Sequence, residues 1–493
     1  MPAPDLADVA LRFRAALPPG QLDVFRIDPL DRLGVFVVQA SLVPDDGGVI
    51  YTGTGYGVSF AEAEVSAVAE LCEEVHVGRA LVALPRVMGD YATLVRERGA
   101  DAVIDPLHLC LPAGGPYTPY MPLEWAPLRR YRDGAAVLFP VEFIAAYSDQ
   151  IAPGPRLITP LTNGLGAGSS IAQALAHGLL ELHQRDGNVL SFRALDRGVT
   201  IEPDAVEDAS TRALLALVKS NGIAVAIKLA STDFGMTNLY VVGDDPSGAP
   251  QAICVTACGE AAHPDRERAL RKALLEFIGS RSRKVATHGP LEALRAISTP
   301  AYFDRNLGAV DLAHEEPRAL AAMCDWLTRD AASLRALLRD TVLSRRENVM
   351  FSHLPTVPAG SVDDPDTRLA LIVARLAQEG LEPYYLDATP DPENWLKVIK
   401  VVVPGLECET MSYHRIGRRG VARLRQRNDP LLLTAPRAGA ERILLTPQDE
   451  AALGGPVWFD AARADAIVGA LYPLYREPGM FAARVALAQE AAQ

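Results

Sequence analysis

The chain has 493 residues, 49% hydrophobic and 22% charged, so it can bury a sizeable core and is not intrinsically disordered. Its 61 acidic and 48 basic side chains give a net charge of −13, which argues against a nucleic-acid-binding protein. The N-terminus lacks a signal-peptide pattern and no apolar run is long enough to cross a bilayer, so we expect a cytoplasmic protein without a membrane partner. Six scattered cysteines predict neither a disulfide framework nor a zinc site.

Secondary-structure patterns alternate along the first 290 residues. After an N-terminal helix, short β-branched or apolar runs predict strands, at 35–39, 48–51, 137–144, 224–230, 238–242 and 252–256. Three longer stretches predict helices, at 59–74, 170–185 and 265–280. The proline-rich segment 112–122 is expected to be irregular. This alternation predicts a mixed α/β fold.

The remainder of the chain continues the pattern. A helical stretch is expected at 318–342, an amphipathic helix at 367–379 and a buried strand at 396–403. Six arginines lie between 415 and 427, a run that could face a peptide, a partner or phosphates, or form a solvated surface that balances nearby acids. We expect one domain over 1–430 and a C-terminal helical extension over 431–493.

The three helices of the first 290 residues repeat one pattern around a glutamate, namely Glu70, Glu181 and Glu276. Eleven residues before each glutamate is a residue that favours the helix N-cap: Ser59, Ser170 and Asp265. Seven and three residues before it are only small residues: Ala63 and Ala67, Ala174 and Gly178, Ala269 and Ala273. Such a stripe lies on one helix face and permits close backbone approach.

Each of these glutamates has apolar neighbours, where a carboxylate is costly unless it is paired or binds a cation. Three such helices could form a site for Mg²⁺ and phosphate, because Mg²⁺ prefers oxygen ligands and often binds together with nucleotide phosphates. The alternative is that each glutamate makes an ordinary capping or salt-bridge contact in an amphipathic helix. The common register of all three favours a site.

Motifs around these helices resemble the YcaO family. The central helix is preceded by Asn163-Gly-Leu-Gly-Ala-Gly168-Ser-Ser and contains His177-Gly-Leu-Leu-Glu181 and Gln-Arg-Asp186. The first helix has Gly55-Tyr-Gly57 before it and then Ser66-Ala-x-x-Glu70-x-x-Glu73, and the third has Ala273-Leu-Leu-Glu276 and Ser280-Arg281. With weaker echoes elsewhere, the resemblance spans roughly residues 10 to 425 in the order that the family has.

This resemblance implies an enzyme that binds ATP and Mg²⁺ and activates a backbone amide oxygen of a ribosomally synthesised precursor peptide. The products of such enzymes are azoline rings, formed by cyclodehydration, or thioamides. It also implies a YcaO-like fold in which repeated strand–helix units surround a nucleotide site. Beside the precursor peptide, a leader-binding or sulfur-delivery protein is an expected partner, and the internal repeat is compatible with a homodimer.

The resemblance places ten residues at nucleotide-binding positions: Glu70, Glu73, Ser169, Gln173, His177, Glu181, Gln184, Arg185, Lys272 and Glu276. Of these, it implies that Glu70, Glu73, Glu181 and Glu276 hold the metal. It assigns no catalytic residue.

Four positions depart from the family pattern. Gln173 and Gln184 stand where members carry glutamate, Lys272 where they carry arginine, and Tyr56 where they carry the lysine of a GKG motif. Gln173 has an independent explanation, because Ser170-x-x-Gln173 is also a capping-box pattern. The two missing carboxylates predict weaker Mg²⁺ binding, and they leave a second hypothesis open: a YcaO-like scaffold that binds a precursor peptide or a catalytic partner without ATP turnover.

Overall fold

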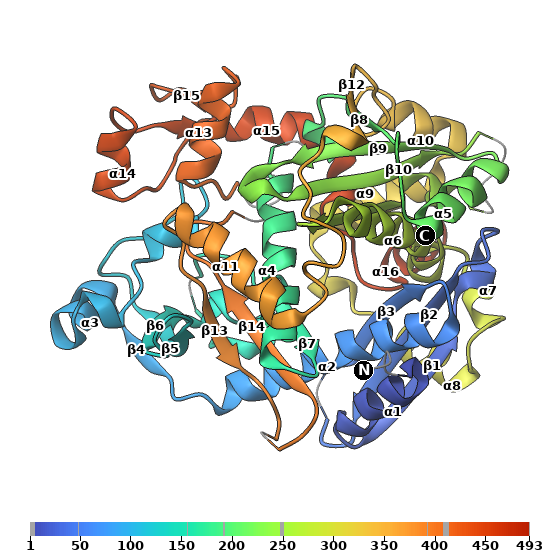
Figure 1. The fold of residues 1–493 in the computed structure, drawn as a ribbon, viewed down its shortest axis with the longest axis horizontal. Coiled ribbons are helices and arrows are strands. Elements are labelled where there is room, and N and C mark those ends of the chain that lie inside the picture. The colour runs from blue at the N-terminus through green and yellow to red at the C-terminus, as the bar shows by residue number, and fades with distance from the viewer. Residues whose placement is uncertain are drawn as a thin grey trace. The chain divides into compact units, whose positions relative to one another are not determined.

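The computed structural model describes residues 5–47, 49–154, 156–190, 193–246, 251–391, 393–407 and 414–492. The chain has a mixed α/β fold and divides into two compact units, each assembled from separate stretches (Figure 1). The first unit comprises residues 1–71, 191–357 and 468–493, and the second comprises 72–190 and 358–467.

The first unit contains two sheets. Helix α1 (Leu6–Ala16) precedes a three-stranded antiparallel sheet, whose strands are β1 (Gly20–Arg26), β2 (Phe36–Pro44) and β3 (Tyr51–Gly57). The second sheet has the order β11-β10-β9-β8-β12, with bounds Cys258–His263, Thr237–Asp244, Ala224–Ser231, Val199–Glu202 and Glu347–Met350. Helix α6 (Arg266–His288) packs on β10, β11 and β3, so it contacts strands of both sheets.

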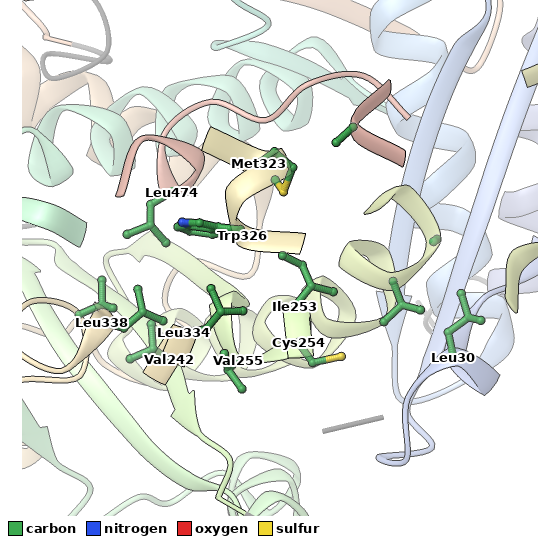
Figure 2. Packing of buried hydrophobic residues seen from close by; sticks show 14 of the residues in the cluster. Leu30, Val242, Ile253, Cys254, Val255, Met323, Trp326, Leu334, Leu338 and Leu474 are labelled. Atoms are coloured by element: carbon green, nitrogen blue, oxygen red, sulfur yellow. The ribbon is translucent and has the colours of Figure 1, made fainter. Parts of the chain in front are cut away.

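Helices cover the apolar interior of this unit: α5 (Ala209–Ser220), α7 (Leu291–Arg295), α8 (Pro300–Gly308), α9 (Pro317–Thr328), α10 (Ala331–Leu338) and α16 (Ala482–Ala491). Figure 2 shows Trp326 and Met323 of α9 in a cluster with Leu334 of α10. Trp326 is 1% exposed and its indole Nε1 donates to the carbonyl of Ala470 over 2.8 Å. The C-terminal stretch is therefore part of the core of the first unit.

The second unit is built on a six-stranded sheet. Its strands are β4 (Val87–Gly89), β5 (Leu123–Arg130), β6 (Ala136–Pro140), β7 (Leu165–Gly168), β13 (Tyr384–Asp387) and β14 (Lys397–Val402). Helix α4 (Ile171–Asn188) packs on β7 and β14, and α11 (Pro365–Gln378) packs on α4 (Figure 1). Helix α3 (Tyr91–Arg98) follows β4 in the chain.

The C-terminal part of the second unit combines helices with short strands. Helices α13 (Arg418–Gln426), α14 (Pro447–Ala452) and α15 (Ala461–Val468) accompany a three-stranded sheet of β15 (Leu432–Leu433), β17 (Trp458–Phe459) and β16 (Glu441–Arg442). The expected extension over 431–493 is thus not purely helical. A domain boundary at residue 430 stays a prediction.

Most elements expected from the sequence are present, with three corrections. The predicted strand 252–256 is wrong: Ala252–Thr256 forms a 3-10 helix, and the strand β11 follows it. Its residues from Ile253 to Thr256 are buried, and an apolar run alone does not distinguish a buried strand from another buried segment. The strand expected at 137–144 ends at Pro140, where a 3-10 helix begins. The strand expected at 48–51 is misplaced: Gly48 is not described, Val49 and Ile50 are not part of a strand, and β3 begins only at Tyr51.

Two expectations about the whole chain also have structural outcomes. Among the described residues, no helix combines the length and apolar character that crossing a bilayer requires. The five cysteines within the described ranges carry free thiols, and Cys408 lies outside those ranges.

Candidate functional site

Each of the three repeated glutamates is anchored to a strand of its own unit. Helix α2 (Phe60–Ala83) carries Glu70, α4 carries Glu181 and α6 carries Glu276. One carboxylate oxygen of each accepts a backbone N–H from a residue in or next to the preceding strand: Thr54 at 2.8 Å, Gly164 at 2.9 Å and Glu260 at 3.2 Å, respectively. The repeat is therefore a strand–helix unit in which the glutamate is fixed by the strand.

Close backbone contact explains the stripe of small residues. A Cβ atom added to Gly259 of β11 would lie 2.2 Å from the carbonyl oxygen of Ala273 on α6. The equivalent distance from Gly166 of β7 to Ala174 of α4 is 2.1 Å. Because these distances are far below van der Waals contact, strand and helix both need minimal side chains at the crossing.

In the first unit, Tyr56 joins the anchored carboxylates. Its hydroxyl donates a long hydrogen bond of 3.4 Å to Glu276. Burial, reinforced by the charges of Glu276 and Glu70, raises the pKa of Tyr56 well above its ordinary value, so the phenol stays neutral. Lys272 is exposed on α6, one helical turn before Glu276. The sequence identified Tyr56 only as a departure from the family pattern, because its contact with a helix some 220 residues away is not local.

In the second unit, four predicted site residues recur every fourth position along α4: Gln173, His177, Glu181 and Arg185. This spacing puts them on one face of the helix. Arg185 Nη2 lies 3.4 Å from Glu181 Oε1, and both side chains are about a quarter exposed. His177 is exposed and its Nε2 lies 4.0 Å from Oε1 of Glu73. This face of α4, the accessible stripe, therefore carries in turn an amide, an imidazole, a carboxylate and a guanidinium group, and it is partly accessible to solvent.

The two glutamines of α4 have different environments. Ser170 accepts the backbone N–H of Gln173 at 3.1 Å, as expected for an N-cap. Gln173 Oε1 in turn accepts the backbone N–H of Ser169 at 3.0 Å and its hydroxyl at 2.9 Å. The N-cap half of the predicted capping box is therefore confirmed, but the Gln173 side chain binds Ser169, the residue before the N-cap, and not the backbone N–H of Ser170 that a capping box requires. Gln184, in contrast, is only 5% exposed and does not belong to the accessible stripe.

Asp186, the residue after Arg185, ties α4 to α13. It is fully buried and accepts hydrogen bonds from Arg423 at 2.5 Å and Arg419 at 3.2 Å. Burial alone would raise the pKa of Asp186, but the two guanidinium groups outweigh it and hold that pKa below the usual range. These arginines of the 415–427 run therefore balance an acid inside the second unit.

Glu407 completes this buried polar cluster. Its Oε1 accepts the backbone N–H groups of Gly417 at 3.1 Å and Gly420 at 2.6 Å, at the N-terminus of α13, and its own backbone N–H donates to Asp186. Burial raises the pKa of Glu407 to about 7. The sequence did not reveal that Asp186 and Glu407 meet, and only the excess of arginines in the run hinted at buried acids.

The carboxylates are suitable ligands for Mg²⁺, but by themselves they do not form a complete coordination shell. Within the described part of the chain, no three His, Cys, Asp or Glu side chains are grouped so as to hold a metal ion. Mg²⁺ usually takes only one or two carboxylates and completes its shell with phosphate oxygens and water. A carboxylate with one oxygen anchored to a backbone N–H retains lone pairs for such a contact.

Comparison with known proteins agrees with this arrangement. A family model described as YcaO cyclodehydratase, ATP- and Mg²⁺-binding, matches residues 54–407. A protein of Methanothermobacter thermautotrophicus (strain Delta H), described as uncharacterized, is 26% identical over 408 residues, which cover 81% of this chain and 93% of that protein.

Two solved structures share the fold. A heterocyclase in complex with substrate and cofactor superposes with a TM-score of 0.62 at 19% identity, over 88% of this chain and 57% of its own. This chain thus spans little more than half of that heterocyclase. YcaO from Methanopyrus kandleri, bound with AMPPCP and Mg²⁺, gives a TM-score of 0.57 at 19% identity, over 84% of this chain and 94% of its own.

The family match covers all three helices with at least part of the strand before each, and it extends over most of the chain. The chain therefore belongs to the ATP- and Mg²⁺-binding YcaO cyclodehydratase family.

Proposed function

We propose that this protein uses ATP and Mg²⁺ to activate backbone amides of a ribosomally synthesised precursor peptide, and forms either an azoline ring or a thioamide. Family membership supports the cofactors and the general reaction. The observation that carries the proposal is the anchoring of Glu70, Glu181 and Glu276, each by a backbone N–H of a neighbouring strand. Three carboxylates fixed in this way are preorganised acceptors for a hard cation.

The roles proposed for the side chains follow from their charges and exposure. Glu70, Glu73, Glu181 and Glu276 would hold Mg²⁺. Arg185 and Lys272 carry positive charges next to Glu181 and Glu276 in the helices and suit phosphate oxygens. When bound, ATP would supply the phosphoryl group that makes the amide oxygen a good leaving group. Ser169, Gln173 and His177 lie toward the N-terminal end of α4 and would contact the nucleotide through their polar side chains.

The peptide substrate and the partner proteins are also part of the proposal. We expect the substrate to be a precursor peptide, delivered by a separate leader-binding protein or modified together with a sulfur-delivery protein. The heterocyclase was solved with a substrate and a cofactor, which supports the binding of a substrate beside the nucleotide in this chain as well. A homodimer is compatible with the internal repeat.

One observation favours the scaffold hypothesis as a second candidate. The carbonyl oxygen of Gln173 is already engaged by two donors of Ser169, so it replaces an acidic group without offering an equivalent ligand. A YcaO-like chain with such a site could bind a precursor peptide or a catalytic partner and leave ATP intact.

Phosphate release separates the two functions. Purified protein is incubated with ATP, Mg²⁺ and candidate precursor peptides, with and without a sulfide source, while free phosphate and peptide mass are followed. Phosphate release that depends on peptide, with loss of water from the peptide, supports ring formation, and exchange of oxygen for sulfur supports a thioamide. Peptide binding without phosphate release would contradict the proposed activity and support the scaffold.

A further inference from the structure

The five-stranded sheet of the first unit is split between β8 and β9. On their outer edges both strands are well paired, because β8 pairs in parallel with β12 and β9 pairs with β10 over most of its length. Between them, among the residues that the structure describes, β8 and β9 are bridged only where Thr200 lies opposite Lys228. The two strands therefore meet at one point and diverge beyond it.

A cavity of about 390 Å³ lies where the ladder of β8 and β9 would continue. In an antiparallel pair, each step away from Thr200 and Lys228 brings the next residue of one strand opposite the previous residue of the other. The three pairs that are missing in this way comprise six residues, and all six line the cavity: Ile201, Glu202, Pro203, Val225, Ala226 and Ile227. The cavity is therefore a gap in the sheet, and its volume lies within the range of about 300–1,000 Å³ that is usual for ligand sites.

Backbone groups of β9 face this gap. Arg345 Nη2 donates to the carbonyl of Val225 at 2.8 Å, and Arg345 is itself part of the lining. Because alternate residues of a strand direct their N–H and C=O groups to the same edge, the backbone of Ile227 is oriented like that of Val225. On the opposite strand Pro203 cannot donate, since it has no N–H. β9 therefore presents a strand edge with which a further extended segment can pair.

Four exposed charged side chains surround the gap: Glu202, Arg345, Arg346 and Glu347. None of the four forms an ion pair with a described residue. The second arginine, like the first, donates to a backbone carbonyl, that of Asp340 at 3.3 Å. Since the two positive and two negative charges cancel, the rim of the gap favours neither an anion nor a cation. It is complementary to a ligand that carries charges of both signs.

We propose that the gap between β8 and β9 is a docking site for an extended peptide segment that carries acidic and basic side chains and pairs with the edge of β9. Strand addition of this kind obtains affinity from main-chain hydrogen bonds and specificity from side-chain contacts. The missing pairs span about 10 Å at roughly 3.3 Å per residue, so the gap fits about three or four residues of peptide. The site goes beyond the proposed function, because it needs neither ATP nor Mg²⁺ and none of its residues is among the nucleotide-binding positions.

The probe is a blocked pentapeptide, acetyl-Val-Glu-Val-Lys-Val-amide, in which apolar and charged side chains alternate between the two faces of a strand. It is titrated by calorimetry into the full-length protein without ATP or Mg²⁺, and we expect saturable binding at about 1 mM or below. The same peptide, N-methylated at its central valine and at the lysine that follows, lacks an N–H donor on either edge. It should bind about threefold more weakly or worse, because a main-chain hydrogen bond to β9 is lost.

Variants of the exposed side chains test the rim of the gap. Arg346→Met and Glu202→Gln should each weaken peptide binding by about two- to fivefold, as expected for an exposed charge contact. Arg339→Met is the matched control, since Arg339 is exposed just after α10 and does not line the gap.

Two results with the native protein would overturn the site: no saturable binding of the blocked peptide, or equal binding of its N-methylated form. Equal binding by Arg346→Met, Glu202→Gln and Arg339→Met would overturn it as well, because the peptide would then bind elsewhere. ATP binding with Mg²⁺ by these variants should match that of the native protein, so a failure of this site is distinguishable from a failure of the proposed function.

Discussion

Glu181 has two roles that variants can separate: it accepts a hydrogen bond from Gly164, and it carries a negative charge. Glu181→Gln keeps an oxygen that can accept the Gly164 N–H, now at 2.9 Å, but removes the charge. The loss of charge assistance and of the partly exposed Arg185 pair should cost about 1 kcal/mol of folding stability. Glu181→Ala leaves the buried Gly164 N–H without this acceptor, which should cost about 2–3 kcal/mol.

The affinity for ATP with Mg²⁺ should depend on the negative charge of residue 181 and not on its hydrogen bond with Gly164. Two unit charges at 4 Å and an effective dielectric of about 20 interact by about 4 kcal/mol, an upper limit here because the cation sheds water to bind. We expect both variants to weaken Mg²⁺-dependent ATP binding at least about tenfold, in calorimetric titrations with and without Mg²⁺. Glu97→Gln, an exposed change on α3, is the control.

The opposite result would refute this reasoning. If Glu181→Gln is folded and binds ATP with Mg²⁺ as tightly as the native protein, then Glu181 is only a structural anchor for the strand. In that case the common register of the three glutamates reflects strand–helix packing alone, and the metal assignment fails at this position.

Three further predictions concern stability and are checked by urea denaturation. Gly259→Ala should destabilise by more than about 2 kcal/mol because its Cβ would overlap the backbone of α6, whereas Gly308→Ala, with open space around it, should be neutral or slightly stabilising; equal effects would contradict the close crossing. Asp186→Asn should lower the free energy of unfolding by about 3–5 kcal/mol, because it leaves two guanidinium groups of α13 without their buried acid. Arg418→Met, which removes an exposed ion pair, should lower it by less than about 1 kcal/mol. The pKa of Glu407 is raised to about 7 in the folded state, so its contribution to the free energy of unfolding favours folding at low pH and is lost as pH rises from about 4.5 to about 7. Glu407→Gln should flatten this decline in stability with pH. An unchanged pH profile would show that Glu407 does not cause the decline.

Local signals in the sequence predicted the positions of the three helices well. N-cap residues and stripes of small side chains depend on neighbours within a few turns, so the ranges around 59–74, 170–185 and 265–280 agree with α2, α4 and α6. The backbone donors of the glutamates were not predicted, because a carboxylate can be paired in many ways. The glycines of β3, β7 and β11 were a usable signal, since each strand that must cross a helix closely needs one.

Long-range pairing set the limit of prediction in the second unit. Asp186 and Arg419 are 233 residues apart, and nothing in either segment specifies the other beyond opposite charge. The 3-10 helix Ala252–Thr256 shows the same limit on a smaller scale. Its residues are buried by their place in the core, and burial selects apolar side chains whatever the backbone conformation.

The two glutamines of α4 need different physical explanations. Gln173 works at the helix N-terminus, where a neutral carbonyl oxygen satisfies two donors and a carboxylate would do the same with extra help from the helix dipole. Gln184 is 5% exposed, and a carboxylate buried there is costly unless a cation pairs with it. Gln184→Glu should therefore lower the stability of the free protein while it tightens Mg²⁺-dependent ATP binding, so that thermal denaturation with and without ATP and Mg²⁺ moves in opposite directions. If ATP and Mg²⁺ do not offset the loss of stability in Gln184→Glu, residue 184 faces the core and not the nucleotide. In that case only Gln173 accounts for the reduced negative charge at the site.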